Sequence, residues 1–156
     1  MEKRKRIALV AHDNRKKDLL DWVEWNWETL VKHELTCTGT TGTLIEKLLN
    51  KKLREDNKPN KKIKKLKSGP LGGDQQLGAL IATEEIDLLI FLWDPMEPQP
   101  HDVDVKALLR IAVLYNIPMA SNRSSADFII SSKLFNEKYQ QIVKDYTPYL
   151  KREVLK

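Results

Sequence analysis

The stretch DLLIFLW at residues 87–93 restricts the fold more than any other, because every position after the first is apolar. A strand of this kind is buried on both faces, as strands are in a parallel sheet covered by helices. Residues 6–11, 34–38 and 117–121 are further short strand-like runs, and residues 62–66 alternate weakly, as an edge strand does. Strand and helical patterns alternate about five times. This alternation predicts a single-domain, three-layer α/β/α fold with a doubly wound, mainly parallel five-stranded sheet.

Apolar residues repeat at helical spacing in the segments between and after the predicted strands. In the first predicted helix, residues 14–33, Leu20 and Val23 lie on the side that faces the core. Trp22 and Trp25 fall on another side, which favours a subunit contact, with a wide core face as the alternative. The predicted helices are residues 14–33, 41–53, 73–85, 103–116, 124–135 and 136–155.

The chain of 156 residues has the length of one domain, which we take as residues 1–156, and 41% of its residues are hydrophobic. No apolar run approaches the length that spans a membrane. The basic start MEKRKR lacks the apolar segment that follows it in a signal peptide. The single cysteine, Cys37, excludes an intrachain disulfide and fits a reducing compartment. We therefore expect a cytoplasmic protein with no membrane partner.

The net charge of +5 is concentrated in residues 51–67, which hold nine Lys or Arg and two acidic residues. This lysine-rich segment has a balance of +7, which leaves −2 on the rest of the chain. No aromatic residues lie between its lysines, so stacking on bases is not supported and we expect no nucleic-acid partner. A solvated insertion is the simplest interpretation, and a weak attraction for anions remains open.

Polar residues follow each of the first four predicted strands. His12 and Asp13 follow the first strand, and residues 38–41, 68–74 and 94–104 follow the next three. In a doubly wound sheet the carboxyl ends of the strands form the crevice where ligands bind. The sequence therefore predicts a ligand site that collects these four loops.

The TGTT stretch, Thr38, Gly39, Thr40 and Thr41, precedes a predicted helix. It supplies hydroxyl and backbone N–H donors at a helix N-terminus, which favours an anion site, although a simple helix cap would also explain it. Lys16, one turn into the first helix, is in reach of the same region. Ser68 and Gly69 would add a hydroxyl and a bare N–H, with an ordinary turn as the alternative.

His12 and His101 lie in the predicted strand-end loops, whereas His33 lies at a helix end and is expected to be structural. No pair of histidines has metal-ligand spacing, so we expect no metal, and no G-x-G-x-x-G motif supports a dinucleotide. The acid Asp74 and the histidine His101 would share a crevice with a phosphate cradle. Such a set suits proton abstraction beside a carbonyl of a small phosphorylated substrate, where the carboxylate takes the carbon-bound proton and the imidazole polarises the oxygen.

Four motifs, IALVAHD, TGTTG, SGPLGGDQQLGALI and FLWDPMEPQPHDVDVKALLRIA, occur in this order from about residue 6 onward. Together they resemble the methylglyoxal synthase family. The resemblance implies a lyase that converts dihydroxyacetone phosphate to methylglyoxal and inorganic phosphate, without a metal or organic cofactor. It also implies a homohexamer and inhibition by inorganic phosphate. Residues 51–67 depart from the family, because this segment is longer than is usual there.

The resemblance also assigns roles to residues of this chain. Asp74 matches the catalytic base, and His101 matches the residue that hydrogen-bonds the substrate oxygens. Asp104 and Asp94 match acids of the same site, and we count Asp104 among the catalytic residues. The substrate-binding residues implied are His12, Lys16, Thr38, Gly39, Thr40, Thr41, Ser68, Gly69 and His101. A non-catalytic ligand-binding module of the same fold is the alternative, and the presence of both Asp74 and His101 argues against it.

Overall fold

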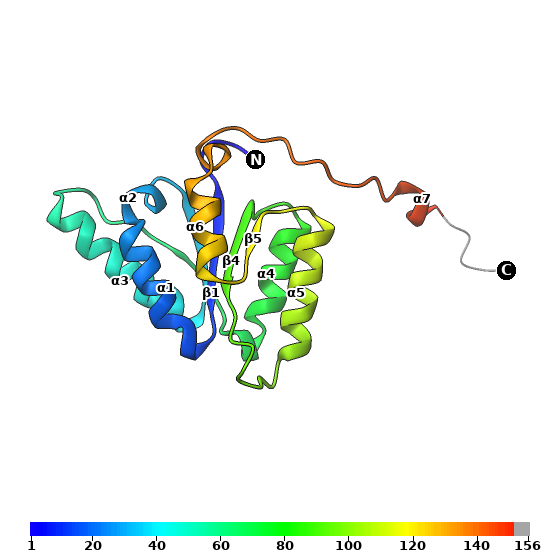
Figure 1. Cartoon of the computed structure of the whole chain (residues 1–156), viewed down its shortest axis with the longest axis horizontal. Helices are drawn as coiled ribbons and strands as arrows, with labels where there is room; N and C mark the ends of the chain where they lie inside the picture. The colour runs from blue at the N-terminus through cyan, green and yellow to red at the C-terminus, as the bar shows by residue number, and fades with distance from the viewer. Residues whose placement is uncertain (152–156) are drawn as a thin grey trace.

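The computed structural model describes residues 1–151 and shows one sheet of five parallel strands in the order β3-β2-β1-β4-β5 (Figure 1). The chain builds the sheet outward from β1, first to β2 and β3 and then, on the other side of β1, to β4 and β5. The predicted doubly wound α/β fold is confirmed, and all of its strand pairs are parallel. The strands are β1 (Arg6–Ala11), β2 (Glu34–Thr38), β3 (Lys64–Leu66), β4 (Leu88–Leu92) and β5 (Met119–Ala120).

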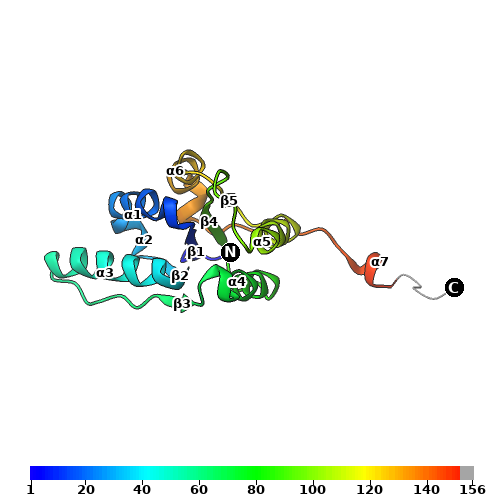
Figure 2. The same cartoon turned by 90° about the horizontal axis from the view of Figure 1, so that it is seen from below.

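Helices cover both faces of the sheet, because right-handed crossovers in opposite directions place their helices on opposite sides. Alternate residues of β1 show the two faces: Ile7 and Leu9 join one buried cluster, and Ala8 and Val10 join the other. Figure 2 shows the helices grouped on the two sides of the sheet. The first cluster contains residues of α1 (Lys16–Trp25), α3 (Gly39–Glu55) and α6 (Arg123–Ser131), and the second contains residues of α4 (Gly73–Ala82) and α5 (Asp102–Leu114).

The expected helix 14–33 is instead three pieces: the 3-10 turn η1 (Asp13–Arg15), α1 and the short α2 (Trp27–Leu30). The break falls at Asn26, whose side-chain amide donates to the carbonyl of Trp22 at 2.9 Å and so competes with continued helix. Trp22 is only 1% exposed, and its indole N–H donates to Asp127 Oδ1 at 2.9 Å. The predicted subunit contact is therefore wrong for Trp22, which belongs to the core. Trp25 is 84% exposed, and its role stays a prediction.

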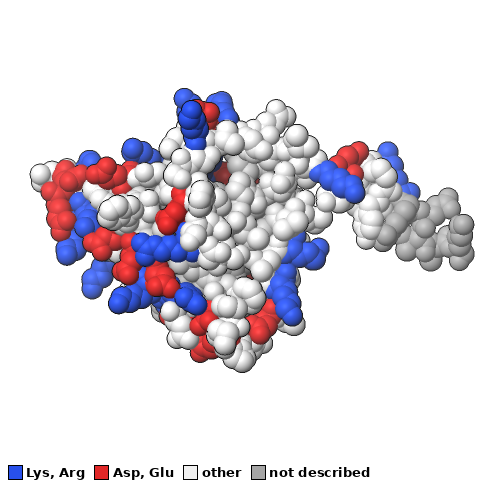
Figure 3. Space-filling view, in the orientation of Figure 1, with Lys and Arg blue, Asp and Glu red and all other residues white. Residues whose placement is uncertain are grey.

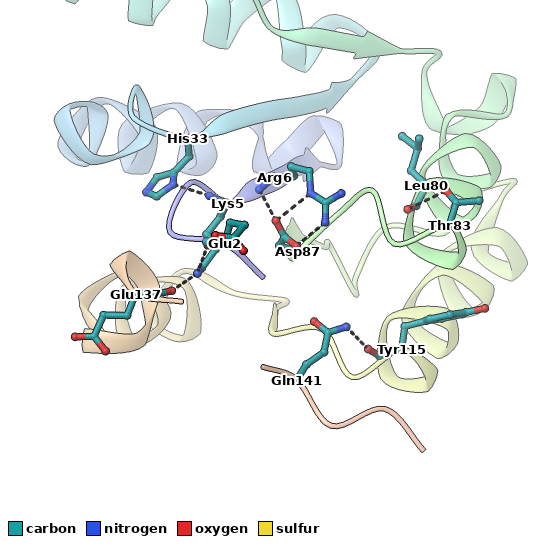
Figure 4. Close-up of polar contacts among 10 residues, drawn as sticks. All are labelled: Glu2, Lys5, Arg6, His33, Leu80, Thr83, Asp87, Tyr115, Glu137 and Gln141. Carbon is teal, nitrogen blue, oxygen red and sulfur yellow. Dashed lines mark hydrogen bonds and ion pairs between the residues drawn. The ribbon is translucent and has the colours of Figure 1, made fainter. Parts of the chain in front are cut away.

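The expected helix 136–155 is wrong over its described part. Helix α6 ends at Ser131, the 3-10 turn η3 (Lys133–Asn136) follows, and the chain then runs extended to the single turn α7 (Thr147–Leu150). Figure 1 shows this last part leaving the body of the molecule. Donors of the body bind the extended backbone: the Lys5 ammonium donates to the carbonyl of Glu137 (Figure 4), and the Asn116 amide donates to that of Ile142 at 2.9 Å. Because these contacts satisfy the carbonyls, the segment needs no helical hydrogen bonds there.

The lysine-rich segment forms the last turn of α3, a loop and the edge strand β3, which confirms the expected edge strand at Lys64–Leu66. Many of its lysines lie beside acids: Lys52 is 2.8 Å from Glu24, and Lys65 pairs with Glu46. Figure 3 shows blue and red side chains intermixed over this side of the molecule. A mixed-sign surface of this kind differs from the basic stripe that is typical of nucleic-acid-binding proteins. Within residues 1–151, no helix is both long enough and apolar enough to cross a membrane.

Candidate active site

A cavity of about 90 Å³ opens at the carboxyl edge of the sheet, where the loops after β1, β2, β3 and β4 meet. Ten of the predicted site residues line it, so strand ends that lie far apart in the sequence meet as expected. Asp94 and Asp104 are not among the lining residues. The ten are His12, Lys16, Thr38, Gly39, Thr40, Thr41, Ser68, Gly69, Asp74 and His101.

Three helices begin at this cavity. Thr38 directly precedes α3, Gly72 precedes α4, and His101 precedes α5. The N-terminus of each helix carries the positive end of the helix dipole, which favours a bound anion nearby. Gly72 has a φ of +94°, a conformation that favours glycine, and this turn places Asp74 in the first turn of α4. The convergence of three helix N-termini therefore favours an anion in the crevice.

The TGTT stretch lies at the start of α3 and is reached by Lys16 from α1. The Lys16 ammonium donates to Thr40 Oγ1 at 2.7 Å and lies 2.6 Å from Asp13 Oδ1. Thr38 and Thr41 are buried, whereas Thr40 is exposed. The hydroxyls at the start of α3, together with the Lys16 ammonium from α1, can surround a phosphate with charge-assisted hydrogen bonds.

Asp74 and His101 face each other in the cavity, with His101 Nε2 3.6 Å from Asp74 Oδ2. This distance is too long for a hydrogen bond. Asp74 Oδ2, His101 Nδ1 and His12 Nε2 are buried, and none of them has a hydrogen-bond partner within the described chain. Buried polar atoms normally find a partner, so three unsatisfied atoms on residues of one cavity indicate a site built for a polar ligand.

Gly69 lies where the acid and the imidazole meet. A Cβ atom at this position would be 2.7 Å from His101 Nε2 and 3.1 Å from Asp74 Oδ2. Only glycine, which has no Cβ atom, leaves the two functional groups in their present positions. The close approach of the loop after β3 is therefore part of the site geometry.

Comparison with known proteins places this geometry in a family. Residues 18–121 match the MGS-like domain family, and the methylglyoxal synthase of Maridesulfovibrio salexigens is 55% identical, over 99% of this chain and all of that protein. The chain belongs to the methylglyoxal synthase family. The methylglyoxal synthase of Oleidesulfovibrio alaskensis is 53% identical over 97% of each chain. The crystal structure of methylglyoxal synthase from Elizabethkingia anophelis superposes with a TM-score of 0.85 and 49% identity, covering 99% of this chain and 95% of that one.

The surroundings of Asp74 and His12 shift their protonation in this methylglyoxal synthase family member. Burial raises the pKa of Asp74, the charges of His101 and His12 lower it in part, and the negative charge of Asp104 raises it again. The pKa of His12 is lowered, mainly by burial and then by the charge of His101. A carboxylate with a raised pKa is a stronger base, and a histidine with a lowered pKa stays neutral near pH 7.

Asp104 and Asp94 lie behind the cavity wall. Asp104 is in the first turn of α5, where its backbone N–H donates to the carbonyl of His101 at 2.9 Å. The backbone N–H of Asp94 donates to His12 Nδ1 at 3.3 Å. Both acids therefore adjoin the residues that line the site, and neither reaches into the cavity itself.

Sequence reasoning missed three residues that contribute to the site. Phe91 packs edge-on against His12 with ring centroids 5.2 Å apart, Gln99 lines the cavity, and the Asn14 amide contacts Asp94 at 3.1 Å. Phe91 and Gln99 lie within the motif FLWDPMEPQPHDVDVKALLRIA, which was the available signal for them, whereas Asn14 lies outside the four motifs and had only its position after β1. Among the described residues, no group of three or more His, Cys, Asp or Glu has the arrangement of a metal site. Cys37 is buried, and burial raises the pKa of its thiol to about 12, so it is not a nucleophile.

Proposed function

We propose that this chain is a lyase that converts dihydroxyacetone phosphate to methylglyoxal and inorganic phosphate through an enediol(ate) intermediate. The observation that carries the proposal is the buried Asp74–His101 pair, 3.6 Å apart, in the same cavity as an anion cradle. The relatives named methylglyoxal synthase, at 53–55% identity over nearly the whole chain, support it.

In the proposed reaction, Asp74 takes a proton from the hydroxymethyl carbon of the substrate while His101 hydrogen-bonds the oxygen on which charge develops. The electron pair of the broken C–H bond forms the enediolate. The C=C electron pair of the enediolate then shifts toward the phosphorylated carbon, and phosphate leaves with the electron pair of the broken C–O bond. The hydroxyl on the former hydroxymethyl carbon becomes the aldehyde C=O, its proton passes to the departing phosphate, and residues 38–41 and Lys16 hold that phosphate. The resulting enolate takes up a proton on its terminal carbon and becomes methylglyoxal.

The direct test incubates the purified protein with dihydroxyacetone phosphate and measures methylglyoxal and free phosphate in parallel. Equal amounts of both products, with the same rate in the presence of a metal chelator, are expected. The alternative is a non-catalytic ligand-binding module of the same fold. It predicts binding of phosphate or substrate without methylglyoxal, and this outcome would overturn the proposed function.

Thr40→Val tests the cradle. The valine keeps the shape of the side chain and removes the hydroxyl that contacts Lys16. Hydrogen bonds to a charged group contribute about 1.5–3 kcal/mol, so we expect KM for the substrate and the inhibition constant for phosphate both to rise about tenfold or more. Enzyme kinetics with and without phosphate measure both constants. Should KM rise while phosphate inhibition stays unchanged, the substrate and the inhibitor do not share this cradle.

Asp104→Asn tests how the neighbouring acid acts. We propose that Asp104 supports catalysis through its charge, because that charge raises the pKa of Asp74. The base works only when deprotonated, so activity falls as pH drops through the pKa of Asp74. Removing the negative charge lowers this pKa, and the acidic limb of the kcat/KM profile should move to lower pH. A limb that stays in place or moves upward would contradict this role.

We further propose that the chain forms a homo-oligomer, as a homohexamer, and acts in the cytoplasm. Trp25 and Phe128 support an assembly, because these two highly exposed aromatics line one shallow groove between α1 and α6, and clustered exposed aromatics are typical of interfaces. Light scattering coupled to size-exclusion chromatography measures the mass. A monomer at all concentrations would rule out the assembly.

A further inference from the structure

His12 is held at the switch point of the sheet, between the loop after β1 and the loop after β4. Main-chain pairing of these strands continues one step further, since the His12 N–H donates to the carbonyl of Leu92 at 3.2 Å. Next, the backbone N–H of Asp94 donates to His12 Nδ1 at 3.3 Å. The Asn14 amide then donates to Asp94 Oδ2 at 3.1 Å and to Glu97 Oε2 at 2.7 Å. We call these four contacts the β1–β4 clamp.

The Asn14 side chain suits this place for a chemical reason. A primary amide carries two N–H donors on one nitrogen, and here each donor has its own carboxylate. The reversed orientation would direct the amide oxygen at two carboxylates, which is repulsive. The other oxygen of Asp94, Oδ1, accepts the backbone N–H of Met96 at 3.0 Å. The buried carboxylate of Asp94 is thus fixed at both oxygens, and its own backbone N–H is fixed with it.

The clamp determines which ring nitrogen of His12 carries the proton. An imidazole nitrogen that accepts an N–H hydrogen bond has no proton of its own, so a neutral His12 must carry its proton on Nε2. This Nε2 is buried and has no partner within the described chain, on a residue that lines the cavity. Phe91, edge-on against the ring, limits its rotation.

The surroundings of His12 favour the neutral ring overall, with burial as the main cause. Burial lowers its pKa first and the charge of His101 second, while Asp74, Asp102 and Asp94 raise it in part. The net direction is downward, so near pH 7 the ring offers one N–H donor and no charge.

We propose that Asn14 and Asp94 are positioning residues that hold His12 as the neutral Nε2–H tautomer, which donates a hydrogen bond to a substrate oxygen. The substrate in this statement rests on the proposed function, whereas the tautomer does not. A neutral donor suits an enediolate, because it stabilises the negative oxygen without first transferring a proton to the substrate.

The tautomer can be measured without turnover. Nitrogen-15 NMR of the histidine rings separates the two neutral tautomers and the imidazolium, and the chain has three histidines. We expect the parent protein to show His12 protonated on Nε2 alone at pH 7. A His12 protonated on Nδ1 in the parent protein overturns the proposal without any mutation.

Asn14→Ala removes both donors of the amide, and Asn60→Ala, in an exposed loop, is the matched control. For Asn14→Ala we expect a second His12 tautomer or imidazolium in the spectrum, with kcat on the order of tenfold lower and KM changed less, since small misplacements in an active site are costly. Asn60→Ala should match the parent. Asn14→Ala with an unchanged His12 spectrum and unchanged kcat overturns the role of Asn14.

Two further measurements decide the cases that Asn14→Ala cannot, namely a variant that does not fold and a protein that lacks the proposed activity. If Asn14→Ala does not fold, Asp94→Asn decides, since it retains an oxygen for Met96 and loses the charge that the Asn14 amide binds. A parental His12 spectrum in Asp94→Asn would then count against the clamp. If the parent protein makes no methylglyoxal but shows the Nε2–H tautomer, the proposed function fails and the positioning of His12 stands.

Discussion

Asp74→Asn is expected to lower kcat by a factor of about 100 to 10,000, the usual contribution of a general base. The asparagine keeps the size and shape of the side chain, but its amide cannot accept a carbon-bound proton. Asp74 is only 3% exposed and burial raises its pKa, so the ionised carboxylate destabilises the folded parent protein. The neutral amide should therefore leave the midpoint of thermal unfolding unchanged or raise it.

The measurement combines steady-state kinetics with a binding experiment. Isothermal titration with inorganic phosphate should give the same affinity for Asp74→Asn and the parent, because the cradle at residues 38–41 and Lys16 is untouched. Asp56→Asn, an acid in the exposed loop after α3, is the matched control and should keep full activity. Near-parental turnover by a folded Asp74→Asn protein would falsify the assignment of the base.

Gly69→Ala is expected to lower kcat about 100-fold while the protein still folds. The added methyl group would lie 2.7 Å from His101 Nε2 and 3.1 Å from Asp74 Oδ2, so it must push the two functional groups apart. A displacement of about 1 Å in an active site can cost a factor of about 100 in rate. The three atoms nearest to the methyl group all belong to the side chains of His101 and Asp74, so the imidazole and the carboxylate, rather than the backbone, take up the strain.

Gly78→Ala is the matched control, because a Cβ atom at Gly78 meets nothing within 4 Å. Gly78 lies inside α4, one turn beyond Asp74, where alanine is favoured over glycine by about 1 kcal/mol. The control should therefore be more stable in thermal unfolding and should retain parental kcat. If Gly69→Ala and Gly78→Ala have the same kcat, the close approach at Gly69 has no catalytic role.

Most residues of the site lie in the strand-end loops, where the sequence could predict them. Ten predicted residues line one cavity because buried parallel strands restrict their polar loops to a single edge of the sheet. Asp104 was counted with the catalytic groups but lies outside the lining, in the first turn of α5. Asn14 was not found, since a single amide after a strand has no spacing that distinguishes it from a turn residue.

Predictions from the local sequence pattern were also wrong where contacts between distant parts of the chain determine the structure. Over its described part, the helix predicted at residues 136–155 does not form, and hydrogen bonds from the body bind the extended backbone instead, such as that from Asn116 to the carbonyl of Ile142. Trp22 was placed on the wrong side of its helix, because the Asp127 contact that satisfies its indole comes from α6, about one hundred residues further along the chain.

The sequence by itself determined the order of strands and helices, the family, and the residue types that the reaction needs. These follow from local periodicity and from motifs whose residues are near neighbours in the chain. Only the tertiary structure decided the 3.6 Å approach of His101 to Asp74, the room left by Gly69 and the tautomer of His12. Those three properties depend on ångström-scale distances between separate loops, and such distances are set by the packing of the helices on the sheet.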